Sequence, residues 1–358
     1  MAKICLIAPS RQMGGIERMM SILSSYFVSA GHEVYYLSCR AGRIFYPLDE
    51  KVVFYEPDFT HKTNHIHKIL SYTKTISFLR KKLKQIKPDT IMVFGDIINP
   101  IAIIANRRLG YPIYIADQIS PKQNLGCFKN FMKKITYRHA TGIIAQSQMA
   151  ADFKVQVFGE GLNMRVIPNA LREIADYSGE KKNNWVIGLG RQSFEKGFDR
   201  LIEAFSKIQN HPEWSLVLVG DGPCMNDLKK QAEQLGVSDR VVFMGQQKEV
   251  DRLLAQSRLF VIPSRCEGFP NALCEAMASP LPCISFDSIS ASDIIENGVS
   301  GVVLPDGDID ALAKEIEHLM DDEELRNKYA LSAFSIRKRL QVNRVGDMYL
   351  DFILEKTK

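Results

Sequence analysis

The sequence predicts an α/β protein with two doubly wound domains, each built on a parallel sheet that helices cover on both faces. Short apolar runs rich in β-branched residues alternate with segments of helical period along the chain, and this alternation is typical of parallel β-α units. The length of 358 residues allows two domains of about 150 residues each. A polar and charged segment, residues 169–184, predicts the linker between them.

In the first half, β-branched apolar runs predict the strands of a domain over residues 1–168. These strands are Ile4–Ala8, Val34–Leu37, Val52–Tyr55, Thr90–Phe94, Tyr114–Ala116, Gly142–Ala145 and Arg165–Ile167. Apolar residues recur at helical spacing between them, with a clear stripe in the second of the predicted helices. These helices are Ile16–Ala30, Ile66–Ile86, Ile98–Leu109 and Lys129–His139.

The second half repeats the pattern and predicts a domain over residues 185–339. Its strands are Trp185–Leu189, Leu216–Val219, Val241–Met244, Leu259–Ile262, Cys283–Phe286 and Gly301–Leu304. Its helices are Asp199–Ile208, Asn226–Leu235, Val250–Gln256, Ala272–Ala278, Ile309–Met320 and Glu323–Ser332. A last segment, Val345–Leu354, has an apolar face at helical spacing. A ligand site is expected in a central cleft, where the carboxyl ends of the two sheets face each other.

Composition and charge argue against several classes of protein. No apolar run approaches the about 20 residues that span a bilayer, and the apolar core at Ile4–Ala8 is too short for a signal peptide. The 7 cysteines form no CxxC pair, which indicates reduced thiols in a cytoplasmic protein. Residues 1–172 hold 24 Lys and Arg against 11 Asp and Glu, whereas residues 173–358 hold 22 against 30. The basic half predicts an anionic partner: a phosphorylated substrate, a phospholipid surface or nucleic acid.

The first candidate site feature is the pair Gly14-Gly15, which follows the first strand and opens the first helix. Paired glycines let the backbone approach a ligand closely, and a helix N-terminus favours an anion. A tight turn without a ligand explains the pair equally well. The chain contains no GxGxxG and no GxxxxGK[ST] pattern, which argues against a dinucleotide site or a P-loop.

The second feature is a pair of cations, Arg191 and Lys196, on the loop after the first strand of the second domain. An Arg fork and a Lys point charge at a strand's carboxyl end can clamp a pyrophosphate. The alternative is a solvated loop in which these cations pair with Glu195.

The third feature is the segment from Glu267 to Glu275, which follows the strand Leu259–Ile262. Pro270 cannot lie inside a helix, so the helix is expected to begin near Asn271 as its N-cap. The two carboxylates could then accept hydrogen bonds from sugar hydroxyls while backbone N–H groups face a phosphate. The alternative is an ordinary capped helix with two surface carboxylates.

These motifs together resemble the retaining glycosyltransferases of family 4, which have the GT-B fold of two Rossmann-like domains. The resemblance runs over nearly the whole chain because the motifs stand in the family's order and spacing. Besides Gly14-Gly15, Arg191, Lys196 and the Glu267-x7-Glu275 pair, it includes Ile167-Pro168-Asn169, Val219-Gly220-Asp221-Gly222-Pro223, Phe243-Met244-Gly245 and Glu267-Gly268-Phe269-Pro270. It also implies that the segment at about 340–358 returns to complete the first, acceptor-binding domain.

The resemblance implies a role for each residue. Arg191 and Lys196 would bind the donor diphosphate and stabilise its departing charge, and Glu267 would hold the transferred sugar, so these three would be catalytic. Glu275 would accept hydrogen bonds from the ribose. The remaining donor contacts would come from Gly14, Gly15, Gly245, Gln246, Phe269, Pro270, Asn271, Ala272 and Leu273. Arg191 and Lys196 would take the place of a metal at the diphosphate, so no cofactor and no metal site are expected.

One position departs from the family's pattern. Many relatives carry a His after the fifth strand of the first domain, whereas this chain reads Ala116-Asp117-Gln118. Gln118 can donate a hydrogen bond but cannot become charged, which affects the choice of donor sugar. Asp117 and Asp96, each at a strand end, are candidates to contact the acceptor or the donor sugar, with a turn residue as the alternative for Asp96.

The predicted helix Lys129–His139 interleaves basic and apolar side chains. This pattern suits an anionic membrane surface, and a packed amphipathic helix with a solvated basic face is the alternative. On the pattern alone the packed helix is favoured, but the resemblance implies a lipid-linked or cell-surface glycan acceptor. A cytoplasmic enzyme that associates peripherally with the inner face of the cytoplasmic membrane is therefore expected from the two together.

The expected activity is transfer of a sugar, with retention, from a nucleotide-sugar donor to a hydroxyl of a glycan or polyprenyl-linked acceptor, with UDP favoured over GDP. Two alternatives remain. A nucleotide-sugar epimerase of the same fold would need acid and base groups in the cleft, and no His is evident for that role. A nucleic-acid-binding protein would use the basic half, but no nucleic-acid fold signature accompanies it.

Overall fold

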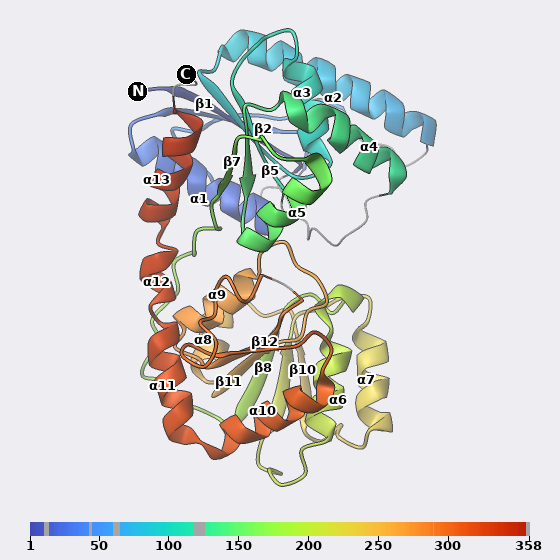
Figure 1. Ribbon diagram of the computed structural model, residues 1–358, viewed down its shortest axis with the longest axis vertical. Helices are drawn as coiled ribbons and strands as arrows, with labels where there is room; N and C mark the ends of the chain where they lie inside the picture. Colours follow the sequence, from blue (N-terminus) through green and yellow to red (C-terminus); the bar gives the residue numbers. More distant parts are fainter. Residues whose placement is uncertain (11–13, 43–44, 60–64, 118–125, 289, 356–358) are drawn as a thin grey trace. The chain divides into compact units, whose positions relative to one another are not determined.

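The computed structural model describes residues 1–10, 14–42, 45–59, 65–117, 126–288 and 290–355, and the side chains of the helix at 65–86 from residue 70 onward. The chain divides into two units (Figure 1). Unit 1 consists of Met1–Ala170 with Leu340–Lys358, and unit 2 of Leu171–Arg339.

The sheet of unit 1 is parallel, with the strand order β3-β2-β1-β4-β5-β6-β7. Its strands are β1 (Lys3–Ala8), β2 (Glu33–Ser38), β3 (Val53–Tyr55), β4 (Thr90–Phe94), β5 (Ile113–Ala116), β6 (Gly142–Ala145) and β7 (Met164–Val166). The order reverses next to β1, because the chain runs outward to β2 and β3 and then returns to β4. In such sheets the ligand site lies at the carboxyl ends of the strands.

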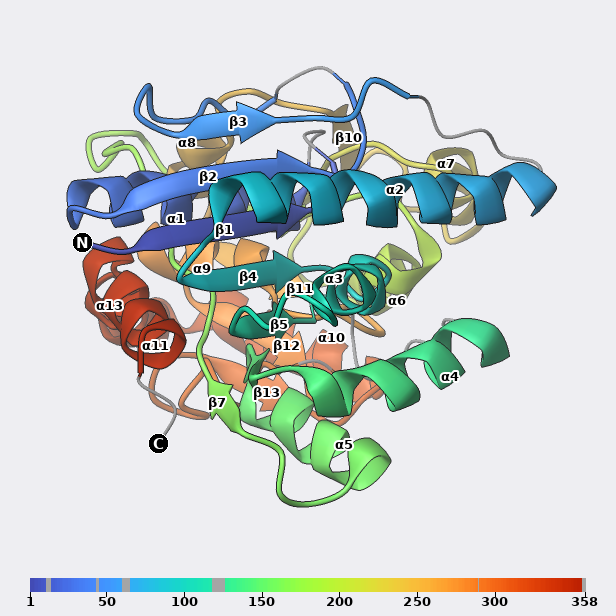
Figure 2. The same ribbon diagram turned by 90° about the horizontal axis from the view of Figure 1, so that it is seen from above.

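Helices cover both faces of this sheet, which is seen from above in Figure 2. They are α1 (Gly15–Ser29), α2 (His65–Ile86), α3 (Ile98–Asn106), α4 (Cys127–Thr136), α5 (Gln148–Phe158) and α13 (Val342–Ile353), with a short 3-10 helix η1 (Tyr137–His139). Alternate residues of β1 divide between the two faces. Ile4 and Leu6 pack in the core with α1 and α13, and Cys5 and Ile7 pack in the core with α2 and α3.

The last helix, α13, lies against α1 in unit 1. Val345, Tyr349 and Phe352 are buried in the same core as α1, and the ring of Phe352 meets that of Tyr114 edge-on at 5.0 Å between centroids. The Tyr26 hydroxyl donates a hydrogen bond to Asp347. The apolar face of α13 therefore packs in the same core as β1, whose residues lie more than 300 positions earlier in the sequence.

Unit 2 has a second parallel sheet, with the strand order β10-β9-β8-β11-β12-β13. Its strands are β8 (Trp185–Leu189), β9 (Ser215–Val219), β10 (Val241–Gly245), β11 (Leu259–Ile262), β12 (Cys283–Phe286) and β13 (Val302–Leu304). Its helices are η2 (Phe194–Lys196), α6 (Phe198–Ser206), α7 (Met225–Gln234), α8 (Val250–Ala255), α9 (Asn271–Ala278), α10 (Ile309–Asp321), α11 (Glu323–Ala333) and α12 (Ile336–Arg339).

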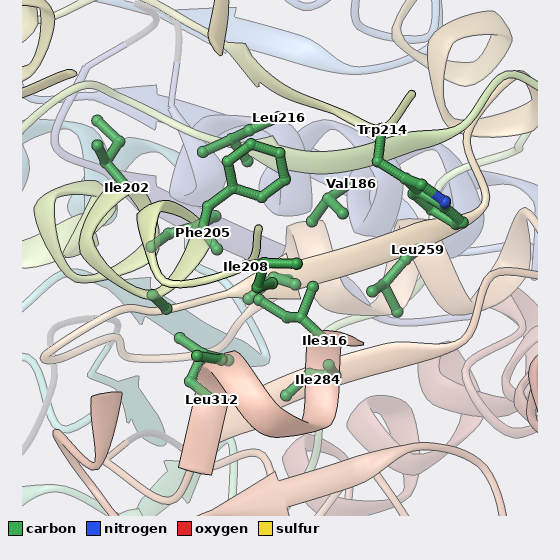
Figure 3. Close-up of a cluster of buried hydrophobic side chains, with 14 of the residues drawn as sticks. Val186, Ile202, Phe205, Ile208, Trp214, Leu216, Leu259, Ile284, Leu312 and Ile316 are labelled. Carbon is green, nitrogen blue, oxygen red and sulfur yellow. The ribbon is translucent and has the colours of Figure 1, made fainter. Parts of the chain in front are cut away.

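The main core of unit 2 lies between the sheet and the helices α6 and α10 (Figure 3). Leu216 and Ile284 come from the strands, Phe205 from α6 and Ile316 from α10, and all four are buried. The strands whose ends carry the site loops are therefore anchored in a buried core.

The predicted α/β class with two parallel sheets is confirmed, and every predicted strand is present to within a residue or two at each end. The structure adds α5 and α12, which the apolar pattern did not reveal. The predicted helix Ile98–Leu109 ends at Asn106, and Lys129–His139 begins earlier, at Cys127, and closes as a 3-10 turn.

The expected linker, residues 169–184, is less solvated than its polar composition suggests. Leu171 and Ile174 are buried, and Ala170 packs in the core of unit 1. Within the described part of the chain, no helix combines the length and apolar character needed to cross a membrane.

Candidate functional site

Three loops of unit 2 meet at the carboxyl ends of β8, β9 and β11. Gly220, after β9, has a φ of +128°, and a Cβ there would overlap the carbonyl oxygen of Gly190, after β8. Gly197 has a φ of +68°, and a Cβ there would overlap the carbonyl oxygen of Pro263, after β11. Glycine is therefore required at both positions, because the backbones touch and the left-handed conformation disfavours side chains.

Two of the predicted catalytic residues form an ion pair across these loops. Lys196 Nζ lies 2.9 Å from Glu267 Oε1, and the Ser264 hydroxyl donates to the same oxygen at 2.6 Å. The Glu267 side chain is 9% exposed and that of Lys196 is 23% exposed. The partner of Lys196 is therefore a nearly buried carboxylate, whereas the alternative for this loop was a solvated contact with Glu195.

Arg191 lies at the start of the same loop with an exposed side chain. Burial would raise the pKa of Glu195, but hydrogen bonds from Ser193 and the backbone lower it, and the charges of Arg191 and Lys196 lower it further. Both cations of the loop therefore act on the carboxylate between them in the sequence.

The segment after Glu267 differs in detail from the expectation. The N-cap of α9 is Pro270, not Asn271, and no side chain caps this end. A proline needs no partner for a backbone N–H that it lacks. The N–H groups of Asn271 and Leu273 donate to Phe269 and Pro270 at 2.9 and 3.0 Å. Among the other predicted contacts, the Phe269 and Leu273 side chains are buried and Ala272 is half-buried.

Glu275 lies inside unit 2 and accepts a hydrogen bond from Arg172. The Arg172 Nη2 to Glu275 Oε2 distance is 3.1 Å, and Arg172 also forms a two-pronged contact with Asp251 of α8, with Nη1 to Oδ2 at 2.8 Å. Burial would lower the pKa of Arg172, but these two carboxylates raise it. Burial would raise the pKa of Asp251, but Arg172 lowers it. Glu275 therefore belongs to a charged network.

Gly245 ends β10 with a φ of +64°, and its carbonyl accepts from the Gly220 N–H at 2.8 Å. Gln246, the next residue, is exposed. This edge of unit 2 thus joins the loop after β10 to the loop after β9.

In unit 1, Gly14 is the N-cap of α1 and Gly15 is its first residue. Glu17 lies in the first turn, and a Cβ at Gly14 would overlap its carboxylate. The Ser10 hydroxyl donates to Glu17 at 2.6 Å. This helix N-terminus therefore already holds a carboxylate, which the helix dipole stabilises.

Asp96 and Asp117, at the ends of β4 and β5, are joined by one cation. Lys133 Nζ lies 2.6 Å from Asp96 Oδ1 and 3.0 Å from Asp117 Oδ2. Lys154 Nζ lies 3.6 Å from Asp117. Both carboxylates are buried, so the two aspartates that were expected separately form a single cluster.

Neutral donors complete this cluster. The Tyr137 hydroxyl donates to Asp117, and Asn99 Nδ2 donates to the same oxygen at 2.9 Å. Burial would raise the pKa of Asp117, but Lys154, Lys133 and the Tyr137 hydroxyl lower it. Asp117 is therefore held as a carboxylate.

This cluster corrects the expected basic face of α4. Lys133 is one of the basic residues of the predicted helix Lys129–His139, but its side chain points inward and is 14% exposed. Lys134 is exposed, as are Phe128 and Phe131 at 70% and 60%. The helix therefore directs one cation inward and leaves aromatic and basic side chains outside.

Gln118 lies outside the described residues. Within the residues that are described, no three His, Cys, Asp or Glu side chains are grouped as metal ligands. The sequence did not single out Arg172 or Lys154 for any role, because the first lies in the polar segment taken as a linker and the second in the unpredicted α5.

The two units, each built on a Rossmann-like parallel sheet, have the architecture of the GT-B fold. The chain matches solved structures of this fold. Anabaena HepE in complex with UDP and glucose matches with a TM-score of 0.82 at 20% identity, over 99% of this chain and 100% of that one. The lipopolysaccharide outer core galactosyltransferase WaaB matches with 0.80 at 20% identity, over 99% and 100%.

Residues 13–172 match the family described as Glycosyltransferase Family 4, and residues 172–334 match the one described as Glycosyl transferases group 1. The two matches together run from residue 13 to residue 334. The chain therefore belongs to the family 4, group 1 glycosyltransferases and is a glycosyltransferase.

Two curated relatives are similar over most of their length. A Campylobacter jejuni enzyme named GalNAc-alpha-(1->4)-GalNAc-alpha-(1->3)-diNAcBac-PP-undecaprenol alpha-1,4-N-acetyl-D-galactosaminyltransferase is 26% identical, over 99% of each chain. The Escherichia coli UDP-Gal:alpha-D-GlcNAc-diphosphoundecaprenol alpha-1,3-galactosyltransferase is 26% identical, over 79% of this chain and 80% of that one.

Proposed function

We propose that this glycosyltransferase moves a sugar from a UDP-sugar, with retention at the anomeric carbon and without a metal, to a hydroxyl of a polyprenyl-diphosphate-linked glycan. The observation that carries the proposal is the Lys196–Glu267 pair on adjoining loops of unit 2, with Arg191 on the same loop as Lys196. A donor needs cations at its diphosphate and an acceptor of hydrogen bonds at its sugar, and these loops supply both.

In the proposed reaction, the bond between the anomeric carbon and the diphosphate oxygen breaks. The acceptor oxygen bonds to the same face of that carbon, and its proton passes to the departing diphosphate. Negative charge grows on the diphosphate as positive charge grows on the sugar. Arg191 and Lys196 stabilise the first of these charges, which lowers the barrier because fixed charges need no reorganisation.

Glu275 is proposed to accept hydrogen bonds from the donor ribose while Arg172 holds its carboxylate. The nucleobase would meet the backbone at Gly245 and Gln246. The backbone of the Phe269–Leu273 segment would also contact the donor. The N–H groups of Asn271 and Leu273 in this segment already donate to the carbonyls of Phe269 and Pro270. UDP is favoured by the UDP-Gal donor in the name of the E. coli relative and by the UDP complex of the HepE structure.

The acceptor is proposed to bind unit 1, near Asp96 and Asp117. The names of both curated relatives describe undecaprenol-linked acceptors, which supports a lipid-linked acceptor here. A lipid-linked acceptor places the enzyme at a membrane surface. The exposed aromatic and basic residues of α4 support peripheral binding to the cytoplasmic face of the inner membrane.

The test uses the full chain with a panel of UDP- and GDP-sugars and a short-chain polyprenyl-diphosphate glycan. We expect acceptor-dependent release of UDP, a product whose anomeric configuration matches the donor by NMR, and equal rates with EDTA or Mg²⁺. An inverted product would overturn retention, and activity lost in EDTA and restored by Mg²⁺ would overturn metal independence. Interconversion of donor sugars without acceptor would identify an epimerase instead.

A further inference from the structure

We propose that Arg265 is a positioning residue that fixes the loop of Lys196 against the loop of Glu267; this inference rests on the proposed function of that pair. Arg265 precedes Glu267 by two residues in the sequence. It contacts the Lys196 loop through both its backbone and its side chain.

The backbone contact joins the two loops directly. The Arg265 N–H donates to the carbonyl of Glu195 at 2.8 Å. Glu195 is the neighbour of Lys196 in the short helix η2. This bond therefore ties the backbone beside Lys196 to the backbone that leads to Glu267.

The Arg265 side chain makes a second contact with the Lys196 loop, at Phe194. Arg265 Nη1 donates to the carbonyl of Phe194 at 2.9 Å, and the guanidinium lies 4.1 Å from the centroid of the Phe194 ring. The Phe194 ring is 69% exposed, so the guanidinium, rather than a hydrophobic core, supports this residue. Arg265 thus contacts Phe194 at the start of η2, and Glu267 pairs with Lys196 at its end.

Asp199 in the first turn of α6 holds the guanidinium in place. Arg265 Nη1 and Nη2 lie 2.7 and 2.5 Å from the two carboxylate oxygens of Asp199. Burial would raise the pKa of Asp199, but Arg265 lowers it. An Arg fork can bind a carboxylate, a carbonyl and a ring face at once, which a Lys ammonium cannot do.

This support matters because Lys196 has a long side chain with many rotamers and lies on a helix of only three residues. Ordering such a side chain costs conformational entropy. A misplacement of about 1 Å in a catalytic group can cost about a hundredfold in rate. Arg265 acts on the reaction through the position of Lys196 and does not itself touch the substrate.

The test compares Arg265→Met, Arg265→Lys and Asp199→Asn with wild type. We expect kcat to fall about tenfold to a hundredfold, with a smaller change in the Kd for UDP. The matched control is Arg240→Met, because Arg240 also donates to carbonyls and lies 4.6 Å from a ring, that of Phe205, but away from these loops. Its kcat should stay within about threefold of wild type.

A double-mutant cycle separates positioning from general stability. In a Lys196→Ala background, Arg265→Met should lower kcat by less than about threefold, because its effect passes through Lys196. A full tenfold loss in that background would overturn the inference. Asp199→Asn keeps the shape of the carboxylate, so it serves as the test should Arg265→Met fail to fold.

Hydrogen exchange gives a readout independent of activity. Amides of residues 194–197 should exchange at least about tenfold faster in Arg265→Met, while the strands of unit 2 keep their protection. Unchanged exchange would contradict the inference. Normal kcat in Arg265→Met with a large loss in Lys196→Ala would also contradict it and leave the proposed function standing. Faster loop exchange together with normal turnover in Lys196→Ala would overturn the proposed function alone.

Discussion

Lys196 Nζ lies 2.9 Å from Oε1 of Glu267, so the cation proposed for the diphosphate is already paired with the carboxylate proposed for the sugar. A donor bound at these loops would contact two groups whose geometry exists before it arrives. Such preorganisation lowers the cost of ordering the site.

Lys196→Ala should lower kcat by about a hundredfold to a thousandfold at saturating donor, because the leaving diphosphate gains charge in the transition state. Arg191→Lys should also turn over poorly, since an ammonium cannot reproduce a two-pronged contact. Steady-state rates at saturating donor, with circular dichroism to verify folding, are the measurement. Near-normal turnover of Lys196→Ala would show that the diphosphate lies elsewhere.

Glu275→Ala should weaken UDP binding, because a hydrogen bond to a charged group contributes about 1.5–3 kcal/mol. Titration calorimetry with free UDP is the measurement. The matched control is Asp251→Asn, which disturbs the same Arg172 network but keeps the Glu275 carboxylate. If both variants bind UDP as wild type does, the ribose assignment is wrong and Glu275 has a structural role.

Lys133→Met should destabilise the protein, because it leaves the buried carboxylates of Asp96 and Asp117 without the ammonium between them. Removing one partner of a buried ion pair costs about 3–5 kcal/mol, and because Lys154 still faces Asp117 we expect a loss at or below the lower end of this range. Urea denaturation at pH 7 measures this loss, and Lys134→Met, an exposed neighbour, is the control. Equal stabilities of the two variants would show that the cluster contributes nothing.

Stability should fall in acid for a related reason. The pKa of Asp117 is lowered in the fold, so its contribution is present above the ordinary aspartate pKa near 4 and is lost as the pH falls through the lowered value. Asp199 and Asp251, with lowered pKa values, act in the same direction. Urea midpoints between pH 7 and pH 3 should decrease, and midpoints that rise toward acid would refute this linkage.

Binding to anionic vesicles should depend on the outward face of α4 and on Arg138 in η1, the 3-10 helix that follows it. Lys134→Glu with Arg138→Glu should reduce it, since each basic residue near such a surface contributes about 1 kcal/mol and salt screens the attraction. Vesicle co-sedimentation at low and high salt measures the effect, with Lys328→Glu in unit 2 as the control. Equal binding to neutral and anionic vesicles would exclude this mechanism.

Much of the fold could be predicted because strands and helices have local signatures. The period of apolar residues located the strands of both sheets, and Gly and Pro marked several of the turns between them. The helix α5 was not predicted because its buried residues are only Ala150, Ala151 and Lys154, which form no apolar stripe. The N-cap of α9 was misplaced by one residue because Pro270 holds the N-cap position and Asn271 is the first residue of the helix.

The sequence by itself determined the α/β class, the alternation of strands and helices, and which glycine and charged residues follow the strands. These features depend on residues that are a few positions apart. Only the tertiary structure decided which charges meet. Lys196 with Glu267, Arg172 with Glu275 and Lys133 with Asp96 are pairs of residues far apart in sequence. Periodicity cannot encode such pairs, since each depends on where parallel strands end and how the following loops pack.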